Sequence, residues 1–472
     1  MTIHLPQRPS KKHCWTISAG VLDAFRMAGR FRRRGFENRS TLSPLHMDRH
    51  NKGLTDDVRM RGFSRRQPVE AALEWLDSEL RPLDAEVVPL QQAASRVLAS
   101  PIDGEIDVPG FDRAMMDGYA VIASSTAGAT LRDGIPLTVL GDSLPGYPYE
   151  GVVGIGEAVR IMTGSPLPVG CDAVLPAESV RNAAGADEAD ARALSGRVVN
   201  ALAEVAPGRH IGRRGEDVAR GARLFEAGRL LRPQDLGVLS SVGAREVRVV
   251  RKPRVRLVVT GNELVPSGSK PDGYRLVDAN GPMLAALVER DHGVVDFPGL
   301  VPDTEDAILD ALRADADVVI VSGGSSVGVQ DLAPMLLATH GELAIHGISM
   351  RPGSPTGLGR FGHRLVFLLP GFPVSCLCAY DFFAGRAIRA LGGRSKTWPY
   401  RSIRAKLTRT LTSPLGRLDY ARVRVGEGGV EPLAISGASV LSSTTRAEGF
   451  LLIPADSEGF AAGTDVEVWL YG

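Results

Sequence analysis

The sequence predicts a multidomain α/β plus β protein: a doubly wound, parallel-sheet α/β domain, a β-rich domain, a small mixed linker domain and a C-terminal β domain. Strand and helix patterns alternate from Arg254 to Leu391, short β segments broken by Gly and Pro fill Thr130 to Pro207, and polar and apolar residues alternate after Arg401. With 472 residues, 44% of them apolar, the chain has the length of about three domains.

The first part of the chain differs in charge from the rest. Residues 1–66 carry 15 Lys/Arg against 5 Asp/Glu, whereas the remainder carries 40 against 49. A basic arm such as "RFRRRGF" could contact nucleic acid or a membrane surface, but the simpler interpretation is a disordered extension over residues 1–64. The four cysteines suit neither a disulfide framework nor a zinc site, and there is no secretory pattern or membrane-spanning run, so we expect a cytoplasmic protein with structural thiols.

The folded part is expected to begin at the helical stretch "PVEAALEWLDSEL", and a second short helix is expected in "LQQAASRVLAS". Domain boundaries follow from the changes of pattern along the chain. The expected segments are 65–111 for the N-terminal helices and linker, 112–206 for the β-rich domain, 207–250 for the second part of the linker domain, 251–396 for the α/β domain and 397–472 for the C-terminal β domain. The acidic, Ala-rich insert "RNAAGADEADARALSG" is expected to be a solvated loop.

Three unusual stretches follow predicted strands of the α/β domain: "TGNEL", "SGGSSVG" and "PGFPVS". Ligands of such sheets bind at the carboxyl ends of the strands, where glycine lets backbone N–H groups approach an anion. A tight strand-to-helix turn would explain one such loop equally well. The sequence contains no P-loop, no complete G-x-G-x-x-G, no H-E-x-x-H and no G-x-S-x-G, so the common nucleotide, zinc-hydrolase and serine-esterase signatures are absent.

Acidic residues gather in the predicted loops, among them Asp117, Glu263, Asp278 and Asp331. Carboxylates beside a phosphate-binding loop suit Mg²⁺, which prefers oxygen ligands. Each carboxylate alone could equally form a turn or cap a helix. Asp303 is an example, since it precedes "TEDAILDAL" and is expected to be its N-cap.

Eight motifs together resemble one family. "VPGFDRAMMDGYAV", "RIMTGSPLPVGCDAVLPAE", "RRGEDVARGARLFEAG", "VVTGNELV", "VDAN", "SGGSSVGVQD", "RPGSPTGLG" and "LLPGFPVS" occur in the order and roughly the spacing of the molybdopterin molybdenumtransferases, whose relatives include the C-terminal domain of gephyrin. The resemblance covers about residues 65–472. It implies a molybdopterin-binding type of α/β domain and a β-rich lid domain.

The resemblance also implies a reaction, in which adenylated molybdopterin and molybdate bind, Mg²⁺ assists, AMP leaves and molybdenum is placed on the dithiolene sulfurs. It implies an elongated homodimer with its active site at the interface, and contacts with the molybdopterin adenylyltransferase and apo-molybdoenzymes, without nucleic acid or membrane. By motif, the catalytic candidates are Asp117, Thr163, Asp217, Glu263, Asp278 and Asp331, and the metal candidates are Asp117, Glu263, Asp278 and Asp331. The candidates for binding molybdopterin are Ser322, Gly323, Gly324, Ser325, Ser326, Gly328, Arg351, Ser354, Pro370, Phe372 and Pro373.

The chain departs from the family pattern in the last two motifs. Arg351 and Ser354 stand where the family commonly has lysines, and Phe372 stands where it commonly has asparagine. Serine supplies no charge, whereas arginine can clamp a phosphate with two hydrogen bonds. Two other functions therefore stay open: a nucleotide pyrophosphatase that shares the α/β domain, and a binding or scaffold paralogue with an altered pocket. The sequence does not separate molybdate from tungstate.

Overall fold

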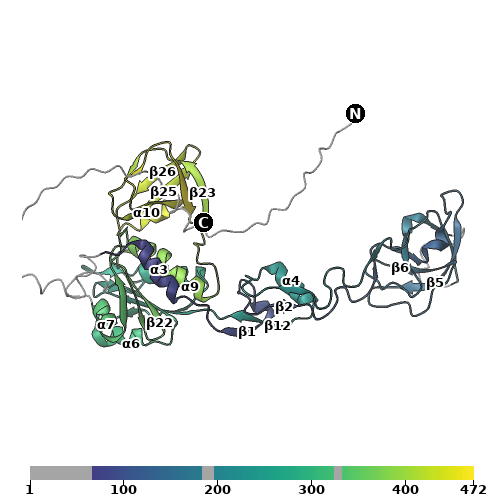
Figure 1. Ribbon diagram of the computed structural model, residues 1–472, viewed down its shortest axis with the longest axis horizontal. Helices are drawn as coiled ribbons and strands as arrows, with labels where there is room; N and C mark the ends of the chain where they lie inside the picture. The colour runs from purple at the N-terminus through teal and green to yellow at the C-terminus, as the bar shows by residue number, and fades with distance from the viewer. Residues whose placement is uncertain (1–65, 183–195, 324–331) are drawn as a thin grey trace, which may run out of the picture. The chain divides into compact units, whose positions relative to one another are not determined.

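The computed structural model describes residues 66–182, 196–323 and 332–472. They form two compact units: residues up to Leu83 together with Lys252–Gly472, and Asp84–Arg251. The expected N-terminal extension, most of the acidic insert and residues 324–331 lie outside the described residues (Figure 1).

The α/β domain of the first unit is built on a seven-stranded sheet with the order β16-β13-β18-β22-β21-β19, and β17 also pairs with β13. The strands are β13 (Arg254–Thr260), β16 (Val294–Asp296), β17 (Leu300–Val301), β18 (Val318–Ser322), β19 (Glu342–His346), β21 (Gly357–Phe361) and β22 (Arg364–Leu369). The strands β13, β16, β17, β18 and β22 run parallel, as expected, whereas β21 and β19 extend the sheet in antiparallel fashion. The alternating sequence pattern did not predict these two antiparallel strands at the edge of the sheet.

Helices cover both faces of this sheet, as in a doubly wound fold (Figure 1). They are α3 (Val69–Glu79), α5 (Asn280–Arg290), α6 (Glu305–Leu312), α7 (Leu332–His340), α8 (Pro373–Ala379), the π-helical turn η4 (Tyr380–Ala384) and α9 (Gly385–Leu391). Alternate residues of β18 divide between two cores: Val318 and Ile320 pack with α3, α5, α8 and α9, and Val319 and Val321 pack with α6 and α7. In the described residues, no helix is long and apolar enough to cross a membrane.

The C-terminal domain contains a six-stranded sheet with the order β20-β25-β27-β29-β23, and β26 pairs with β25. Its elements are β20 (Met350–Arg351), β23 (Arg401–Lys406), β25 (Leu418–Gly426), β26 (Gly429–Ala434), α10 (Ser442–Thr445), β27 (Gly449–Ile453) and β29 (Asp465–Leu470), beside the pair β24 (Leu411–Thr412) and β28 (Gly459–Phe460). The strand β20 comes from the sequence of the α/β domain, so the chain crosses into the C-terminal sheet at Met350 and returns at β21.

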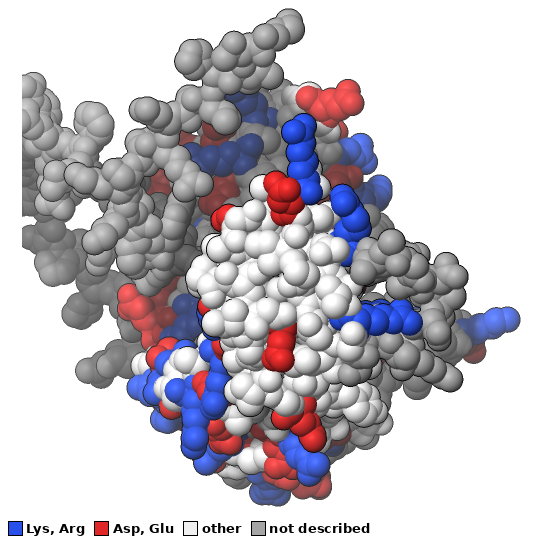
Figure 2. Space-filling view, turned by 90° about the vertical axis from the view of Figure 1, so that its right-hand side faces the viewer, with Lys and Arg blue, Asp and Glu red and all other residues white. Residues whose placement is uncertain are grey.

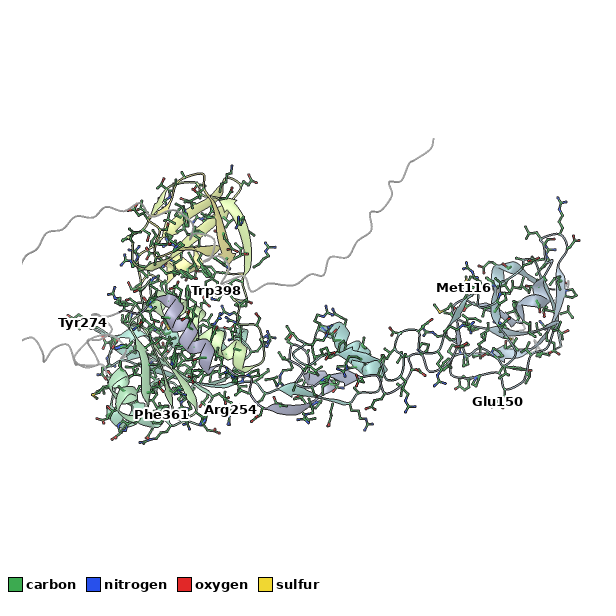
Figure 3. The ribbon with its side chains drawn as sticks, viewed as in Figure 1. Met116, Glu150, Arg254, Tyr274, Phe361 and Trp398 are labelled. Atoms are coloured by element: carbon green, nitrogen blue, oxygen red, sulfur yellow. The ribbon has the colours of Figure 1, made fainter. Side chains whose placement is uncertain are left out.

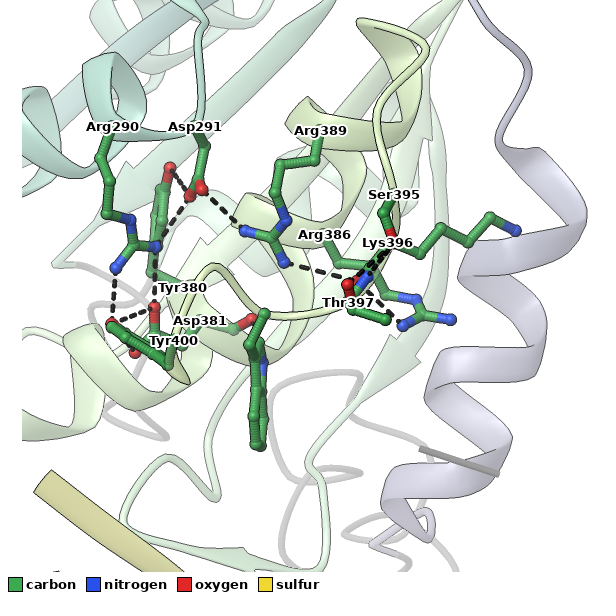
Figure 4. A network of polar contacts seen from close by, with 11 residues as sticks. Arg290, Asp291, Tyr380, Asp381, Arg386, Arg389, Ser395, Lys396, Thr397 and Tyr400 are labelled. Atoms are coloured by element: carbon green, nitrogen blue, oxygen red, sulfur yellow. Dashed lines mark hydrogen bonds and ion pairs between the residues drawn. The ribbon is translucent and has the colours of Figure 1, made fainter. Parts of the chain in front are cut away.

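A buried polar network connects α5, η4 and the segment that leads into the C-terminal domain (Figure 4). Arg290 Nη2 donates to Asp291 Oδ2 at 2.8 Å and to Asp381 Oδ1 at 3.0 Å, and Tyr400 Oη donates to Asp381 Oδ2 at 2.9 Å. Arg389 Nη1 donates to Asp291 Oδ1 at 2.8 Å. Burial raises the pKa of Asp381, and Arg290 opposes that shift. Because each buried charge has an oppositely charged partner, ion pairing offsets the desolvation of these charges, and the network joins the α/β domain to the C-terminal domain.

The second unit contains a six-stranded mixed sheet with the order β7-β4-β6-β5-β9-β8. The strands are β4 (Gly118–Val121), β5 (Ile135–Ser143), β6 (Glu157–Ile161), β7 (Ala173–Pro176), β8 (Val180–Asn182) and β9 (Val198–Ala201), with the 3₁₀ turns η2 (Ala123–Thr126) and η3 (Ala177–Ser179). Figure 2 shows one face of the β5 and β6 region, where charged side chains lie mainly around a largely uncharged centre.

The remaining part of the second unit is a small mixed α and β structure. Its elements are β1 (Ala85–Pro89), η1 (Leu90–Gln92), β2 (Ile102–Asp103), β3 (Arg113–Ala114), β10 (Ile211–Gly212), β11 (Arg223–Phe225), α4 (Pro233–Ser241) and β12 (Glu246–Val250). The prediction of a helix in "LQQAASRVLAS" was wrong, because only the 3₁₀ turn η1 forms there. Val97 and Leu98 instead form β-bridges to Leu230 and Val249, so pairing with distant segments overrides local helix propensity.

Candidate active site

Three of the motif loops begin at the same edge of the α/β sheet. The strands β13, β18 and β22 are parallel neighbours, and Ser322 pairs with both Val259 and Leu369 at their carboxyl ends. The loops "TGNEL", "SGG" and "PGFP" therefore start side by side, where a parallel sheet binds its ligands.

Glycine is required at this edge because backbones approach each other closely. Gly323 has a φ of +94°, and a Cβ added there would lie 2.0 Å from the carbonyl oxygen of Thr260. A Cβ on Gly371 would lie 3.6 Å from the Cα of Gly323, an ordinary van der Waals contact, so the two loops are neighbours there without a steric need for glycine at position 371. The first described glycine of the Gly/Ser-rich loop thus permits a backbone arrangement that no other residue allows without strain.

Asn280, the first residue of α5, connects two of these loops. Its Nδ2 donates to Ser322 Oγ at 2.9 Å and to the carbonyl oxygen of Gly371 at 2.8 Å. Sequence reasoning included "VDAN" among the motifs but selected only Asp278 from it. The available signal was an amide side chain at a predicted helix start beside a strand-end loop.

Several buried polar atoms at this edge have no partner among the described residues: Thr260 Oγ1, Asn280 Oδ1 and Asp303 Oδ1. Such atoms are uncommon in folded proteins and usually have a water, ion or ligand as partner. The expectation that Asp303 is the N-cap of the following helix was wrong, because Thr304 holds that position. Asp303 instead follows β17, which pairs with the end of β13, so sequence reasoning missed a carboxylate near this edge.

Glu263 and Asp278 lie at opposite ends of a short parallel pair, β14 (Leu264–Val265) and β15 (Leu276–Val277). Glu263 is exposed, and Asp278 is buried. Asp278 Oδ1 accepts a hydrogen bond from the Gly281 N–H at 2.9 Å, which fixes the turn that opens α5. Tyr274, on the loop between the two strands, is fully exposed (Figure 3).

The "RPGSP" segment is attached to the C-terminal domain. Arg351 pairs with Asp419 through two hydrogen bonds, one of them Nε to Oδ1 at 3.0 Å. Asp419 is fully buried and also accepts a hydrogen bond from Ser413 Oγ at 2.6 Å. The carbonyl oxygen of Ser354 accepts a hydrogen bond from the Ile348 N–H at 2.8 Å. One edge of the Arg351 guanidinium is thus already occupied by a carboxylate.

The "PGFP" turn leads directly into α8. Pro370 is buried, Pro373 is the first helical residue, and Phe372 at the N-cap has 62% of its surface exposed. The N–H of Val374 donates to the carbonyl oxygen of Ala438 in the C-terminal domain at 2.9 Å. Burial raises the pKa of Cys376, on the same helix, to about 12, so this cysteine is a neutral structural thiol, as expected.

Asp117 and Thr163 lie together in the second unit. Asp117 Oδ1 accepts hydrogen bonds from the backbone N–H of Thr163 at 2.7 Å and from its hydroxyl at 2.8 Å. The backbone hydrogen bond, followed by the hydroxyl, holds the pKa of Asp117 below its ordinary value. Both residues are exposed, so the carboxylate is ionised and accessible. Asp217 is also exposed and lies on a separate turn. Its backbone N–H donates a hydrogen bond to the carbonyl oxygen of Val108 at 3.0 Å.

The other candidates, Gly324, Ser325, Ser326, Gly328 and Asp331, lie outside the described residues. Within residues 66–182, 196–323 and 332–472, no three His, Cys, Asp or Glu side chains form a group that could hold a metal ion.

The fold defines a multidomain protein whose α/β domain gathers three glycine-bearing loops at the carboxyl ends of its parallel strands. Family models match three successive regions: "MoeA N-terminal region (domain I and II)" over residues 67–243, "Probable molybdopterin binding domain" over 256–390 and "MoeA C-terminal region (domain IV)" over 404–471. The chain belongs to the molybdopterin molybdenumtransferase family.

Individual relatives agree with that assignment. The chain is similar to molybdopterin molybdenumtransferase 2 of Mycobacterium tuberculosis, with 35% identity over 81% of this chain and 94% of the relative. It is also similar to the molybdopterin molybdenumtransferase of Haemophilus influenzae, with 32% identity over 84% of this chain and 97% of the relative. The crystal structure of the molybdopterin biosynthesis MoeA protein from Pyrococcus horikosii matches with a TM-score of 0.74 and 32% identity, covering 86% of this chain and all of that one.

Proposed function

We propose that this protein inserts molybdenum from molybdate into adenylated molybdopterin and releases AMP. The observation that supports this most is the meeting of three glycine-bearing loops at the ends of β13, β18 and β22, which leaves backbone accessible beside the start of helix α5. Backbone N–H groups and a helix N-terminus favour a phosphate group. These features indicate only a phosphate group. That the substrate is adenylated molybdopterin is inferred from the family motifs, which occur in the family's order in this chain.

The proposed reaction has two balanced steps without oxidation or reduction. Water adds across the pyrophosphate linkage, so that AMP leaves and molybdopterin keeps its own phosphate. Molybdate then loses one oxo group as water, which takes up the two thiol protons, while the two dithiolene sulfurs bond to molybdenum.

Each described residue has a limited task in this proposal. The backbone at Gly323 and Gly371 accommodates the phosphate end of molybdopterin, and the exposed ring of Phe372 stacks on the flat pterin. The ionised Asp117, oriented by Thr163, acts at the pyrophosphate.

The donor atoms near the strand ends suit a hard cation. Mg²⁺ takes few protein carboxylates and shares its shell with substrate phosphates, so a group of three protein ligands is not required. We propose that Glu263, Asp278 or Asp303 of the first unit, Asp117 of the second and Asp331 provide its oxygens. When bound, the cation neutralises charge on the pyrophosphate.

The assembly and location of the protein are part of the same proposal. The candidate residues are divided between the two units, which a homodimer could combine in one site by pairing the α/β domain of one subunit with the β-rich domain of the other. The proposal also includes a cytoplasmic location and transient contacts with the molybdopterin adenylyltransferase and apo-molybdoenzymes.

Complementation tests the proposed function. Expression in a strain that lacks the transferase should restore nitrate reductase activity, and the purified protein should release AMP from adenylated molybdopterin only when molybdate is present. Hydrolysis of free dinucleotides without molybdate would indicate the pyrophosphatase instead. Failure to complement, with ligand binding intact, would indicate the scaffold.

The altered pocket has its own test. If Ser354 and Phe372 face the pterin phosphate, Ser354→Lys should tighten binding of molybdopterin about tenfold and steepen its salt dependence, because it restores a charge-assisted hydrogen bond. Phe372→Asn should weaken binding by removing the stacking ring. Titration of both variants at low and high salt measures these effects, and unchanged affinities in both would place the ligand elsewhere.

A further inference from the structure

We propose that Asn280 is a positioning residue that fixes the spacing between the Ser322–Gly323 loop and the Gly371–Phe372 turn, and that it thereby sets the affinity of the site for the phosphate end of its substrate. The inference rests on the proposed function, because it assigns these two segments to the substrate. Asn280 itself is buried, with 7% of its surface exposed, and its amide nitrogen contacts both segments.

The orientation of the Asn280 amide is fixed by its partners. The carbonyl oxygen of Gly371 can only accept a hydrogen bond, so the nitrogen of the amide must face it at 2.8 Å. The second hydrogen of the same nitrogen is directed to Ser322 Oγ at 2.9 Å. A single NH₂ group therefore holds both segments, and a side chain without two donors on one atom cannot replace it.

Asn280 provides the link beyond the end of the sheet. Among the residues that the structure describes, the ladder between β18 and β22 ends at the pair Ser322 and Leu369. Past that pair, the backbones of Gly323 and Gly371 are neighbours, and neither residue has a side chain that could connect the two segments. The Asn280 amide adds a directional connection at this level.

The anchor of this connection is rigid. Asn280 begins an 11-residue helix, α5, whose Leu284 and Val288 are fully buried in the main core. The preceding turn is held by Asp278 Oδ1, which accepts the Gly281 N–H. On its other side, the "PGFP" turn is held by the hydrogen bond from Val374 to Ala438. The "PGFP" turn is therefore hydrogen-bonded to a core helix on one side and to the C-terminal domain on the other. Loss of the Asn280 amide removes the hydrogen bond to the helix.

Two substitutions of Asn280 distinguish the loss of its hydrogen bonds from the loss of its side-chain volume. Asn280→Asp keeps the shape of the side chain but turns an oxygen toward the Gly371 carbonyl, and Asn280→Ala removes the connection altogether. Both should raise the KM for adenylated molybdopterin about tenfold, with kcat within about twofold of wild type, because the chemistry lies elsewhere. Backbone N–H exchange in residues 371–377 of the ligand-free protein should accelerate in both variants. Asn200→Asp, the same change on β9 of the other unit, is the matched control and should leave both readouts unchanged.

A double-mutant cycle tests whether Asn280 acts through Ser322. Ser322→Ala should raise KM in the wild-type background and have a smaller effect when Asn280 is already Ala. Unchanged KM and unchanged exchange in both Asn280 variants would overturn the inference, and so would fully additive effects with Ser322→Ala. If Asn280→Ala does not fold, the Asp variant is read by the same measurements. If the wild type itself inserts no molybdenum, the proposed function fails, whereas the exchange experiment still decides whether Asn280 holds the loops.

Discussion

The ion pair between Arg351 and Asp419 allows a prediction that separates two roles of Arg351, ligand clamp and domain connection. Asp419 is fully buried and is bonded by Arg351 and Ser413, with Arg417 Nε at 3.4 Å from Oδ1. Removing one partner of a buried ion pair costs about 3 to 5 kcal/mol. Because the side chains of Arg351 and Arg417 are 28% and 29% exposed and can turn toward water, we expect Asp419→Ala to cost about 3 kcal/mol.

Arg351→Ala should cost less, about 2 kcal/mol, because Ser413 still donates a hydrogen bond to Asp419 and the charge of Arg417, 3.4 Å away, still offsets that of the carboxylate. Urea unfolding of the two single variants and the double variant gives their coupling energy, which we expect to be about 2 kcal/mol. Arg424→Ala, on β25 with Asp419, is the matched control. Its contact with Glu431 is exposed and 3.9 Å long, so this substitution should cost less than about 1 kcal/mol. A coupling energy below about 0.5 kcal/mol, together with a raised KM for Arg351→Ala, would refute the connection and favour the clamp.

Three further predictions concern single positions. Gly323→Ala should destabilise the protein by about 3 kcal/mol in urea unfolding, because its Cβ meets a carbonyl oxygen at a positive φ, whereas Gly237→Ala inside α4 has free space and should stabilise by up to about 1 kcal/mol. Thr163→Val should lower kcat/KM about fivefold by removing one hydrogen bond to Asp117, and Thr163→Ser should restore it; equal rates in all three proteins would exclude the hydroxyl from function. Asp235→Asn should cost about 2 kcal/mol at pH 7. Hydrogen bonds, chiefly from Arg229, hold the pKa of Asp235 far below its ordinary value of 3.8, so its stabilisation is present above that pH and is lost as the pH falls through the lower folded-state value. The difference in unfolding midpoint between wild type and Asp235→Asn should therefore shrink below about pH 4, and a constant difference would contradict the assignment.

The sequence by itself determined the fold class, the parallel strands of the α/β domain and the family. These features are local or ordered along the chain: apolar runs such as "VVIVS" form buried strands, and Gly-rich stretches follow them. The sequence also placed the three motif loops side by side, because parallel strands bring their carboxyl ends together.

Only the tertiary structure decided which side chains at that edge meet. Asn280 reaches Ser322 and Gly371, 42 and 91 residues away, and no local pattern specifies such distances. Likewise, Arg351 resembles a ligand clamp in sequence, yet β20 joins the C-terminal sheet and turns its guanidinium to Asp419. The physical reason is that hydrogen bonds and ion pairs act over a few ångströms in space, whereas sequence patterns describe only neighbours along the chain.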